Sequence, residues 1–269
     1  MTSYAVISSD LSPKYAWYLP LTCLAWRDAC GCEPLVILVG SRAAWEADAA
    51  GRVALRYALK VGAKVSYIPQ VSGYRTGTVA QVSRLFACCA DVRRDDLLLT
   101  TDVDMWPLSR GAFSPMPGND GMVLFYSNGC GDGTYPMCYL RATTETWRVV
   151  MRPSVHDAAE NVALLLREFS NPDGSDYWQE WYTDQRAFAA RIKRWDGHPG
   201  RCLMVPRDGH PPVDRVWYGH WPRPLPAGLV DAHLVAQNNR APWEHLRELL
   251  SYCGVHDLAL ADSYAKEAL

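Results

Sequence analysis

The sequence predicts an α/β fold with a mostly parallel β-sheet and helices on both of its faces. Short apolar runs alternate with segments of helical periodicity from residue 4 to residue 108, a pattern typical of strands joined by helical crossovers. The chain of 269 residues is 49% hydrophobic and 21% charged. This length and composition support a large buried core within one domain.

The expected elements of the first part follow in chain order. The apolar run at 4–8 predicts a strand, and Pro13 predicts the start of a helix, because proline is favoured in the first helical turn. That helix carries apolar residues at helical spacing, namely Trp17, Leu21, Leu24 and Ala25. Further short apolar runs predict strands at 35–39, 64–68 and 96–100. Helical periodicity predicts helices at 45–59 and 81–91.

The composition changes after Leu108, where Gly, Pro and Asn become frequent. One strand is expected in this second part, at 122–126. Helices are expected where apolar residues recur at helical spacing, at 144–151, 158–169, 178–193 and 243–252. We therefore expect one domain over 1–269 that consists of two halves, 1–108 and 109–269.

The composition argues against a nucleic-acid-binding, secreted or membrane-spanning protein. The formal net charge is −2, so no dedicated nucleic-acid surface is expected. No signal peptide is evident, and no apolar run approaches the about 20 residues that span a bilayer. The nine cysteines are odd in number and scattered, which indicates reduced thiols and a cytoplasmic location.

An acidic pair follows the strand expected at 96–100. Asp102 and Asp104 stand where that strand emerges from the sheet, and open α/β sheets bind ligands beyond the carboxyl ends of their strands. Carboxylates in such a crevice must be solvated, paired or bound to a cation. Oxygen ligands suit Mg²⁺ or Mn²⁺, which commonly share coordination with substrate phosphates. Two exposed acids in a capped loop are the alternative.

This acidic pair at a strand end resembles that of the GT-A glycosyltransferases, and the order of motifs is closest to the retaining family 8 enzymes. Those enzymes carry an arginine on the helix before the acidic pair, and Arg84 occupies the matching place. The resemblance implies a GT-A fold with a nucleotide-binding half and an acceptor half. It implies that Asp102 and Asp104 hold Mn²⁺ or Mg²⁺ with a UDP- or GDP-sugar donor, and that Arg84 bridges the acidic motif and this donor.

Two later segments extend the resemblance. Asp184 and Gln185 are similar to an Asp-Gln pair that lies near the transferred sugar in the family, which makes them the expected catalytic residues. The carboxylate would hold sugar hydroxyls and the amide would support positive charge at the anomeric carbon. A polar helix turn is the alternative. His233 matches the C-terminal metal-binding histidine, with His220 as the second choice.

The sequence also departs from the family. The Lys-Pro-Trp that follows the family's histidine is replaced by Ala241-Pro242-Trp243, so Arg240, one place earlier, is the expected diphosphate-binding cation. The family's small-residue Asn-Ala/Ser-Gly segment, which lines the donor sugar, has no counterpart at 128–138. The resemblance therefore does not identify the sugar.

The expected function is metal-dependent transfer of a sugar from a nucleotide sugar to a glycan, protein, lipid or small-molecule acceptor in glycan biosynthesis, with stereochemistry left open. Asp10 is expected to bind the nucleoside or to cap a helix. Trp178, Trp181 and Tyr182 are expected to pack in the core or to stack on an acceptor sugar. The alternatives are a sugar nucleotidyltransferase, which the glycine-free segment 8–13 disfavours, and a non-catalytic module that binds nucleotide sugars or glycans.

Overall fold

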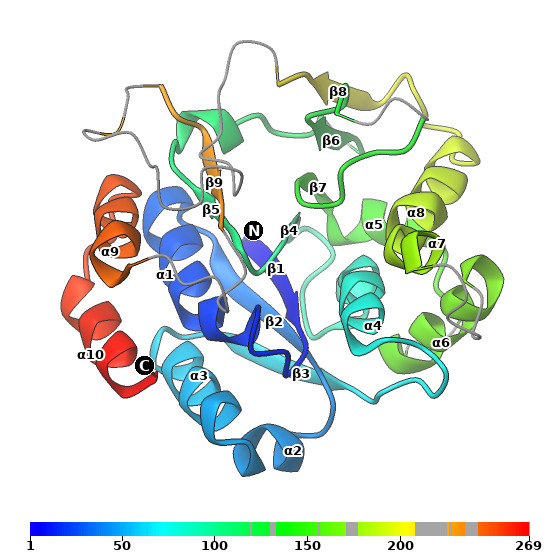
Figure 1. The fold of residues 1–269 in the computed structure, drawn as a ribbon. Helices are drawn as coiled ribbons and strands as arrows, with labels where there is room; N and C mark the ends of the chain where they lie inside the picture. Colours follow the sequence, from blue (N-terminus) through cyan, green and yellow to red (C-terminus); the bar gives the residue numbers. More distant parts are fainter. Residues whose placement is uncertain are drawn as a thin grey trace.

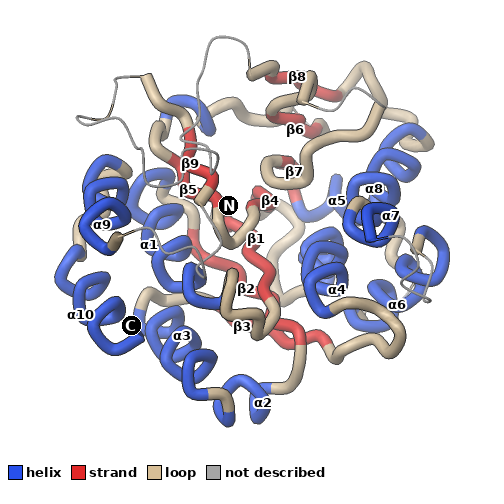
Figure 2. The backbone as a smooth tube through the Cα atoms, in the orientation of Figure 1, coloured by secondary structure: helices blue, strands red, loops and turns tan. Residues whose placement is uncertain are grey.

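The computed structural model describes residues 1–118, 120–129, 133–154, 157–170, 177–207, 225, 228–234 and 242–268. A seven-stranded sheet runs through the centre of the molecule, and helices flank it on two sides (Figure 1). The strand order is β3-β2-β1-β4-β7-β6-β8. Figure 2 shows the same arrangement by element type, with the helices gathered on either side of the strands.

Four strands form the parallel part of the sheet, in the order β3 (Lys64–Ile68), β2 (Glu33–Val39), β1 (Ser3–Ser9) and β4 (Leu97–Thr101). The sheet continues with three strands of mixed direction, β7 (Leu140–Thr143), β6 (Met122–Phe125) and β8 (Cys202–Val205). β7 is antiparallel to both β4 and β6, whereas β8 is parallel to β6. A separate antiparallel pair joins β5 (Met105–Pro107) to β9 (Asp231–His233).

The two faces of the sheet have different helical covers. One core cluster unites Ile7 of β1 and alternate residues of β2 with four helices, α1 (Leu19–Cys30), α3 (Ala49–Lys60), α9 (Trp243–Tyr252) and α10 (Leu258–Ala268). The intervening residues pack against another four, α4 (Thr76–Ser83), α5 (Thr144–Met151), α6 (Ala158–Phe169) and α8 (Thr183–Lys193). Because side chains alternate across a strand, fully apolar strands bury both faces. The predicted α/β class is confirmed.

Four predicted helices differ from those observed. In place of the helix expected at 81–91, α4 ends at Ser83 and a 3-10 helix follows over Arg84–Cys89. The first predicted helix begins at Leu19 rather than Pro13, and it is Pro20 that occupies its first turn. The helix expected at 45–59 is divided into α2 (Arg42–Ala47) and α3 at Asp48, whose carboxylate caps α3 by accepting a hydrogen bond from the Gly51 N–H at 2.6 Å. The helix expected at 178–193 is likewise divided, at Tyr182, into α7 (Tyr177–Trp181) and α8.

Among the described strands and α-helices, the sequence did not reveal five, namely β5, β7, β8, β9 and α10. The four strands among them have three or four residues each, too few for a clear period of two. Within the described ranges, no helix is long and apolar enough to cross a membrane.

Asp96 holds the start of β4 in place. Its carboxylate accepts hydrogen bonds from the Thr2 N–H at 2.7 Å and from the N–H and guanidinium of Arg93 at 3.0 and 2.9 Å. Its carbonyl accepts the Thr144 N–H at the start of α5. Burial alone would raise the pKa of Asp96, but these hydrogen bonds outweigh it and lower the pKa from 3.8 to about 2.

We expect Asp96→Asn to reduce the free energy of unfolding at pH 7 by about 1.5 kcal/mol, since hydrogen bonds to a charged group are lost. The folded pKa lies below the unfolded one, so this stabilisation is complete above about pH 5 and is lost as pH falls through about 2. Urea denaturation at several pH values measures the difference. Asp95→Asn is the control, because Asp95 is 64% exposed and should change stability by less than about 0.5 kcal/mol. A wild-type advantage that stays constant from pH 7 to about pH 2 would contradict this role of the Asp96 charge.

Candidate active site

A cavity of about 230 Å³ lies beyond the carboxyl ends of β1 and β4. The chain continues from β1 toward β2 on one side, while β4 lies on the other, so the cavity marks the topological switch point of the sheet. Its polar and charged lining comes from separate segments, namely Ser8, Ser9, Asp10, Gln81, Arg84, Asp102, Asp104, Asp184, Gln185 and His233. A more open hollow over α9 shares no lining residue with it.

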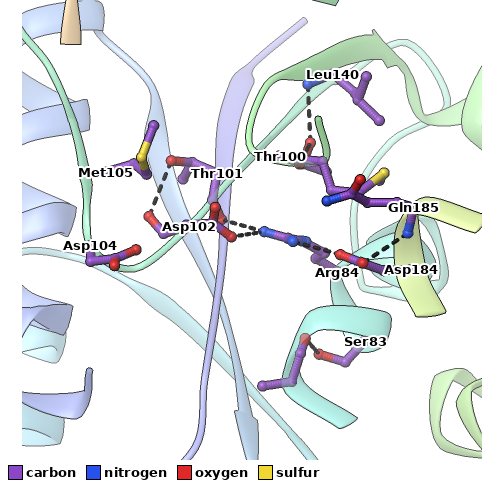
Figure 3. A network of polar contacts seen from close by, with 12 residues as sticks. Ser83, Arg84, Thr100, Thr101, Asp102, Asp104, Met105, Leu140, Asp184 and Gln185 are labelled. Carbon is purple, nitrogen blue, oxygen red and sulfur yellow. Dashed lines mark hydrogen bonds and ion pairs between the residues drawn. The ribbon is translucent and has the colours of Figure 1, made fainter. Parts of the chain in front are cut away.

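Arg84 is the central charged group of this site. It directly follows α4, and its guanidinium is 4% exposed. One terminal nitrogen donates to the carboxylate of Asp102, just after β4, and the other donates to Asp184 Oδ2 on α8 at 2.6 Å. Figure 3 shows the guanidinium lying between the two carboxylates. A single cation therefore joins segments that are up to 100 residues apart in the chain.

Burial and the neighbouring charges have opposite effects on the pKa values of Arg84 and Asp184. Burial disfavours the charged guanidinium, but the carboxylates of Asp102 and Asp184 outweigh it and raise the pKa of Arg84 above its usual value. Complete burial raises the pKa of Asp184, and the charge of Arg84 opposes that shift. Asp184 Oδ1 also accepts the Gln185 N–H at 2.8 Å. Both oxygens of Asp184 are thus held within the protein.

Asp104 and His233 meet through the pairing of β5 with β9. Met105 pairs with His233, and the Leu234 N–H donates to the Asp104 carbonyl at 2.8 Å. This register brings His233 Nε2 to 3.4 Å from Asp104 Oδ2. A carboxylate and an imidazole that line one cavity are suitable ligands for Mn²⁺.

The third predicted metal ligand is oriented differently. Asp102 points toward Arg84, whereas Asp104 lies on the other side of the strand end (Figure 3). Among the described residues, no group of three His, Cys, Asp or Glu side chains is arranged to hold a metal ion. Metal binding by Asp102, Asp104 and His233 therefore stays a prediction. In the structure all three residues line one cavity, and Asp104 and His233 are neighbours.

β9 is itself held by a buried acid that the sequence did not single out. Asp231 is fully buried, accepts the Tyr139 hydroxyl at 3.0 Å, and forms an ion pair with Arg207 at 2.9 Å. Burial raises the pKa of Asp231, and Arg207 opposes this effect. Asp231 lies two positions before His233 on the same strand, so this anchor also fixes the position of the histidine. Nothing in the local sequence distinguishes Asp231 from a surface acid.

The remaining predicted residues are placed as follows. Asp10 lines the cavity, and its carboxylate accepts the Ser12 N–H at 3.0 Å and the Thr76 hydroxyl at 2.6 Å. It therefore ties the end of β1 to the start of α4. Gln185 lines the cavity and its side-chain oxygen accepts the Thr134 hydroxyl at 3.4 Å. Arg240 and His220 lie outside the described residues.

Similar folds occur among solved glycosyltransferases. The chain resembles the glycosyltransferase GlyE of Streptococcus pneumoniae TIGR4, at a TM-score of 0.51 and 14% identity over 98% of this chain and 64% of GlyE. For the bifunctional glycosyltransferase WbbM the TM-score is 0.50 and the identity 10%, over 99% of this chain and 51% of WbbM. For the galactosyltransferase LgtC, solved with donor and acceptor sugar analogues, the values are 0.46 and 15%, over 98% and 94%.

The similarities to GlyE and WbbM, at TM-scores of 0.51 and 0.50, confirm the predicted GT-A fold. At these identities the likeness concerns the fold. The chain spans 64% of the length of GlyE. No protein-family model and no curated protein sequence match this chain.

We expect Arg84→Met to lower the free energy of unfolding by about 3 kcal/mol, because Asp184 would remain buried without its cation. The double variant Arg84→Met/Asp184→Asn should recover part of this loss, since the uncompensated charge is gone. Urea denaturation at pH 7 measures both. Arg191→Met is the control, because its ion pair with Glu168 is partly exposed and should contribute less than about 1 kcal/mol. If Arg84→Met and Arg191→Met lowered the free energy of unfolding equally, the buried ion pairs of Arg84 would stabilise the protein no more than a partly exposed one.

Proposed function

We propose that this chain is a metal-dependent glycosyltransferase that transfers a sugar from a UDP- or GDP-sugar to an acceptor hydroxyl in glycan biosynthesis. One observation carries the proposal: the switch-point cavity of a GT-A fold is lined by Asp102, Asp104, Arg84 and Asp184. Such cavities are where open α/β sheets bind nucleotides. A cluster of carboxylates around a buried arginine suits a diphosphate and its cation better than an apolar ligand.

Asp104, His233 and Asp102 are the proposed ligands of Mn²⁺ or Mg²⁺. When bound, the ion supplies Lewis-acid stabilisation to the departing nucleoside diphosphate. Arg84 adds a fixed positive charge beside the diphosphate and keeps the Asp102 carboxylate oriented. Arg240 is the proposed second cation for the diphosphate.

Asp10, Asp184 and Gln185 are proposed to act on the rest of the donor. Asp10, at the end of β1, is the proposed nucleoside-binding group. The position of Asp184 against Arg84 supports a role in aligning the donor site with the reacting sugar. Gln185, in the first turn of α8 and on the cavity wall, is proposed to support positive charge at the anomeric carbon.

We further propose that 1–269 acts as one domain, which is supported by a core cluster that unites residues from β1 through α10. A cytoplasmic location is proposed from the free thiols of the eight described cysteines.

We expect UDP or GDP to bind about ten-fold more tightly, by about 1.4 kcal/mol, in Mn²⁺ than in EDTA. Asp102→Asn and Asp104→Asn should each lose most of this gain. His233→Ala should weaken binding in Mn²⁺ more than in Mg²⁺, because nitrogen ligands favour transition metals. Isothermal titration calorimetry measures all of these affinities.

The control for this prediction is the exposed Asp95→Asn, which should bind like the wild type. Wild-type metal dependence in both Asp102→Asn and Asp104→Asn would refute the proposed metal site. Tight metal-linked binding without hydrolysis or transfer of any tested nucleotide sugar would instead favour a non-catalytic binding module.

Asp184→Asn and Gln185→Ala should lower turnover by at least about ten-fold while changing UDP affinity much less, as expected for groups whose interactions matter in the transition state. Donor hydrolysis and transfer rates, measured with saturating Mn²⁺, provide the comparison. Arg191→Ala, also on α8, serves as the control. If both variants turn over at the wild-type rate, the two residues are only part of a polar helix turn.

A further inference from the structure

An exposed aromatic surface adjoins the cavity. It is formed by Tyr177, Trp178 and Trp181 of α7 and by the following residue, Tyr182, and is here called the aromatic platform. Trp178 is 61% exposed, and Tyr177 and Tyr182 are 43% and 42% exposed. Large apolar side chains that gather on a surface commonly mark an interaction site, whereas scattered ones need no explanation. The expectation that these rings pack in the core is therefore wrong for Trp178 and Tyr182.

The rings of the platform are ordered by helical spacing. Side chains four positions apart lie on the same face of a helix. Tyr177 stacks on Trp181 with ring centroids 5.8 Å apart and planes inclined by 16°, and Trp178 stacks on Tyr182 at 5.9 Å and 18°. Tyr177 meets Trp178 edge to face, with ring planes at 81°, so the two stacked pairs stand nearly perpendicular to each other. Both rings of the Trp178–Tyr182 pair are exposed.

The platform is fixed relative to the cavity by a buried carboxylate. Glu180, which is 2% exposed, accepts the Arg75 N–H at 2.7 Å, and the Arg75 guanidinium covers the Tyr177 ring at 4.4 Å. Arg75 directly precedes α4, whose first residue, Thr76, donates to Asp10 on the cavity wall. A surface held in this way loses little conformational freedom when it binds a ligand.

The platform is also continuous with the cavity. Trp181 lines the cavity together with Gly77, Asp184 and Gln185. At Gly77 an added Cβ would lie 3.9 Å from both Asp10 Oδ2 and the Trp181 ring, so this ring and the polar wall are close neighbours. Aromatic surface thus extends from Trp181, on the cavity wall, to Trp178, which is exposed to solvent.

The chemistry of the platform selects among possible occupants. Aromatic rings offer a large, rigid apolar face at little entropic cost. A sugar ring has an apolar face of C–H groups and a rim of hydroxyls, so it can lie on such a face while its hydroxyls stay solvated. Apolar ligands prefer concave pockets, whereas the platform is exposed to solvent. The guanidinium of Arg75 at its edge provides hydrogen-bond donors for hydroxyls.

We propose that the aromatic platform binds a sugar ring of the acceptor, so that the acceptor is a saccharide or carries one. This inference rests on the proposed glycosyltransferase function. The ring that lies on Trp178 and Tyr182 is a subsite remote from the reacting hydroxyl, which would enter the cavity past Trp181.

The test is binding of defined oligosaccharides to the full chain, in the presence of UDP and Mn²⁺. Saturation-transfer NMR and calorimetry with lactose, maltotriose, cellotriose, xylobiose and chitotriose provide the probes. At least one should bind the wild type, and Trp178→Ala should weaken it by about ten-fold. Trp178→Tyr should retain most of the affinity, because a flat ring remains. Leu164→Ala, which removes a side chain of α6 that is 42% exposed, is the control and should bind like the wild type.

The inference would be overturned if none of these saccharides bound, or if Trp178→Ala bound them as tightly as the wild type. It would also be overturned if Trp178→Ala weakened binding only to phosphatidylcholine–phosphatidylglycerol vesicles. The affinity for UDP with Mn²⁺ separates this failure from that of the proposed function. If the wild type binds UDP with Mn²⁺ but Trp178 does not affect saccharide binding, only the platform is wrongly assigned. If UDP does not bind at all, the proposed function fails as well.

Discussion

The buried guanidinium of Arg84 is the constraint on which the rest of the site depends. A cation that is 4% exposed must be matched by anions, because desolvation of an unpaired charge is costly. The match comes from Asp102 after β4 and Asp184 on α8. Each of these carboxylates would in turn repel the other without the cation between them. The two ion pairs of Arg84 therefore hold the end of α4, the end of β4 and the start of α8 together.

The pairing of β5 with β9 imposes a second constraint on the other side of the cavity. It brings His233 beside Asp104, and the buried Asp231 secures it through Tyr139 and Arg207. Asp104 thus faces a segment that is more than a hundred residues later in the chain, while Asp102 faces Arg84. The two carboxylates of one short motif consequently have different partners.

Much of the fold was predictable because its signals are local. The helices at 144–151, 158–169 and 243–252 have the predicted bounds, since their apolar spacing and caps lie within a few residues of each other. The parallel strands β1, β2 and β4 were visible as apolar runs buried on both faces. By contrast, β7 contains Arg141, a buried charge that donates to the Phe113 and Pro115 carbonyls. Its burial depends on partners distant in sequence, so its strand pattern was obscured.

The sequence by itself determined the α/β class, the strand end that carries Asp102 and Asp104, and the chemical types of residue available to the site. These features follow from periodicity and composition over short windows. Only the tertiary structure decided which side chains meet: that Arg84 pairs with both Asp102 and Asp184, that His233 lies beside Asp104, and that the rings of α7 face solvent beside the cavity. The physical reason is that ion pairing, strand register and side-chain exposure are set by contacts between distant segments, which no local pattern specifies.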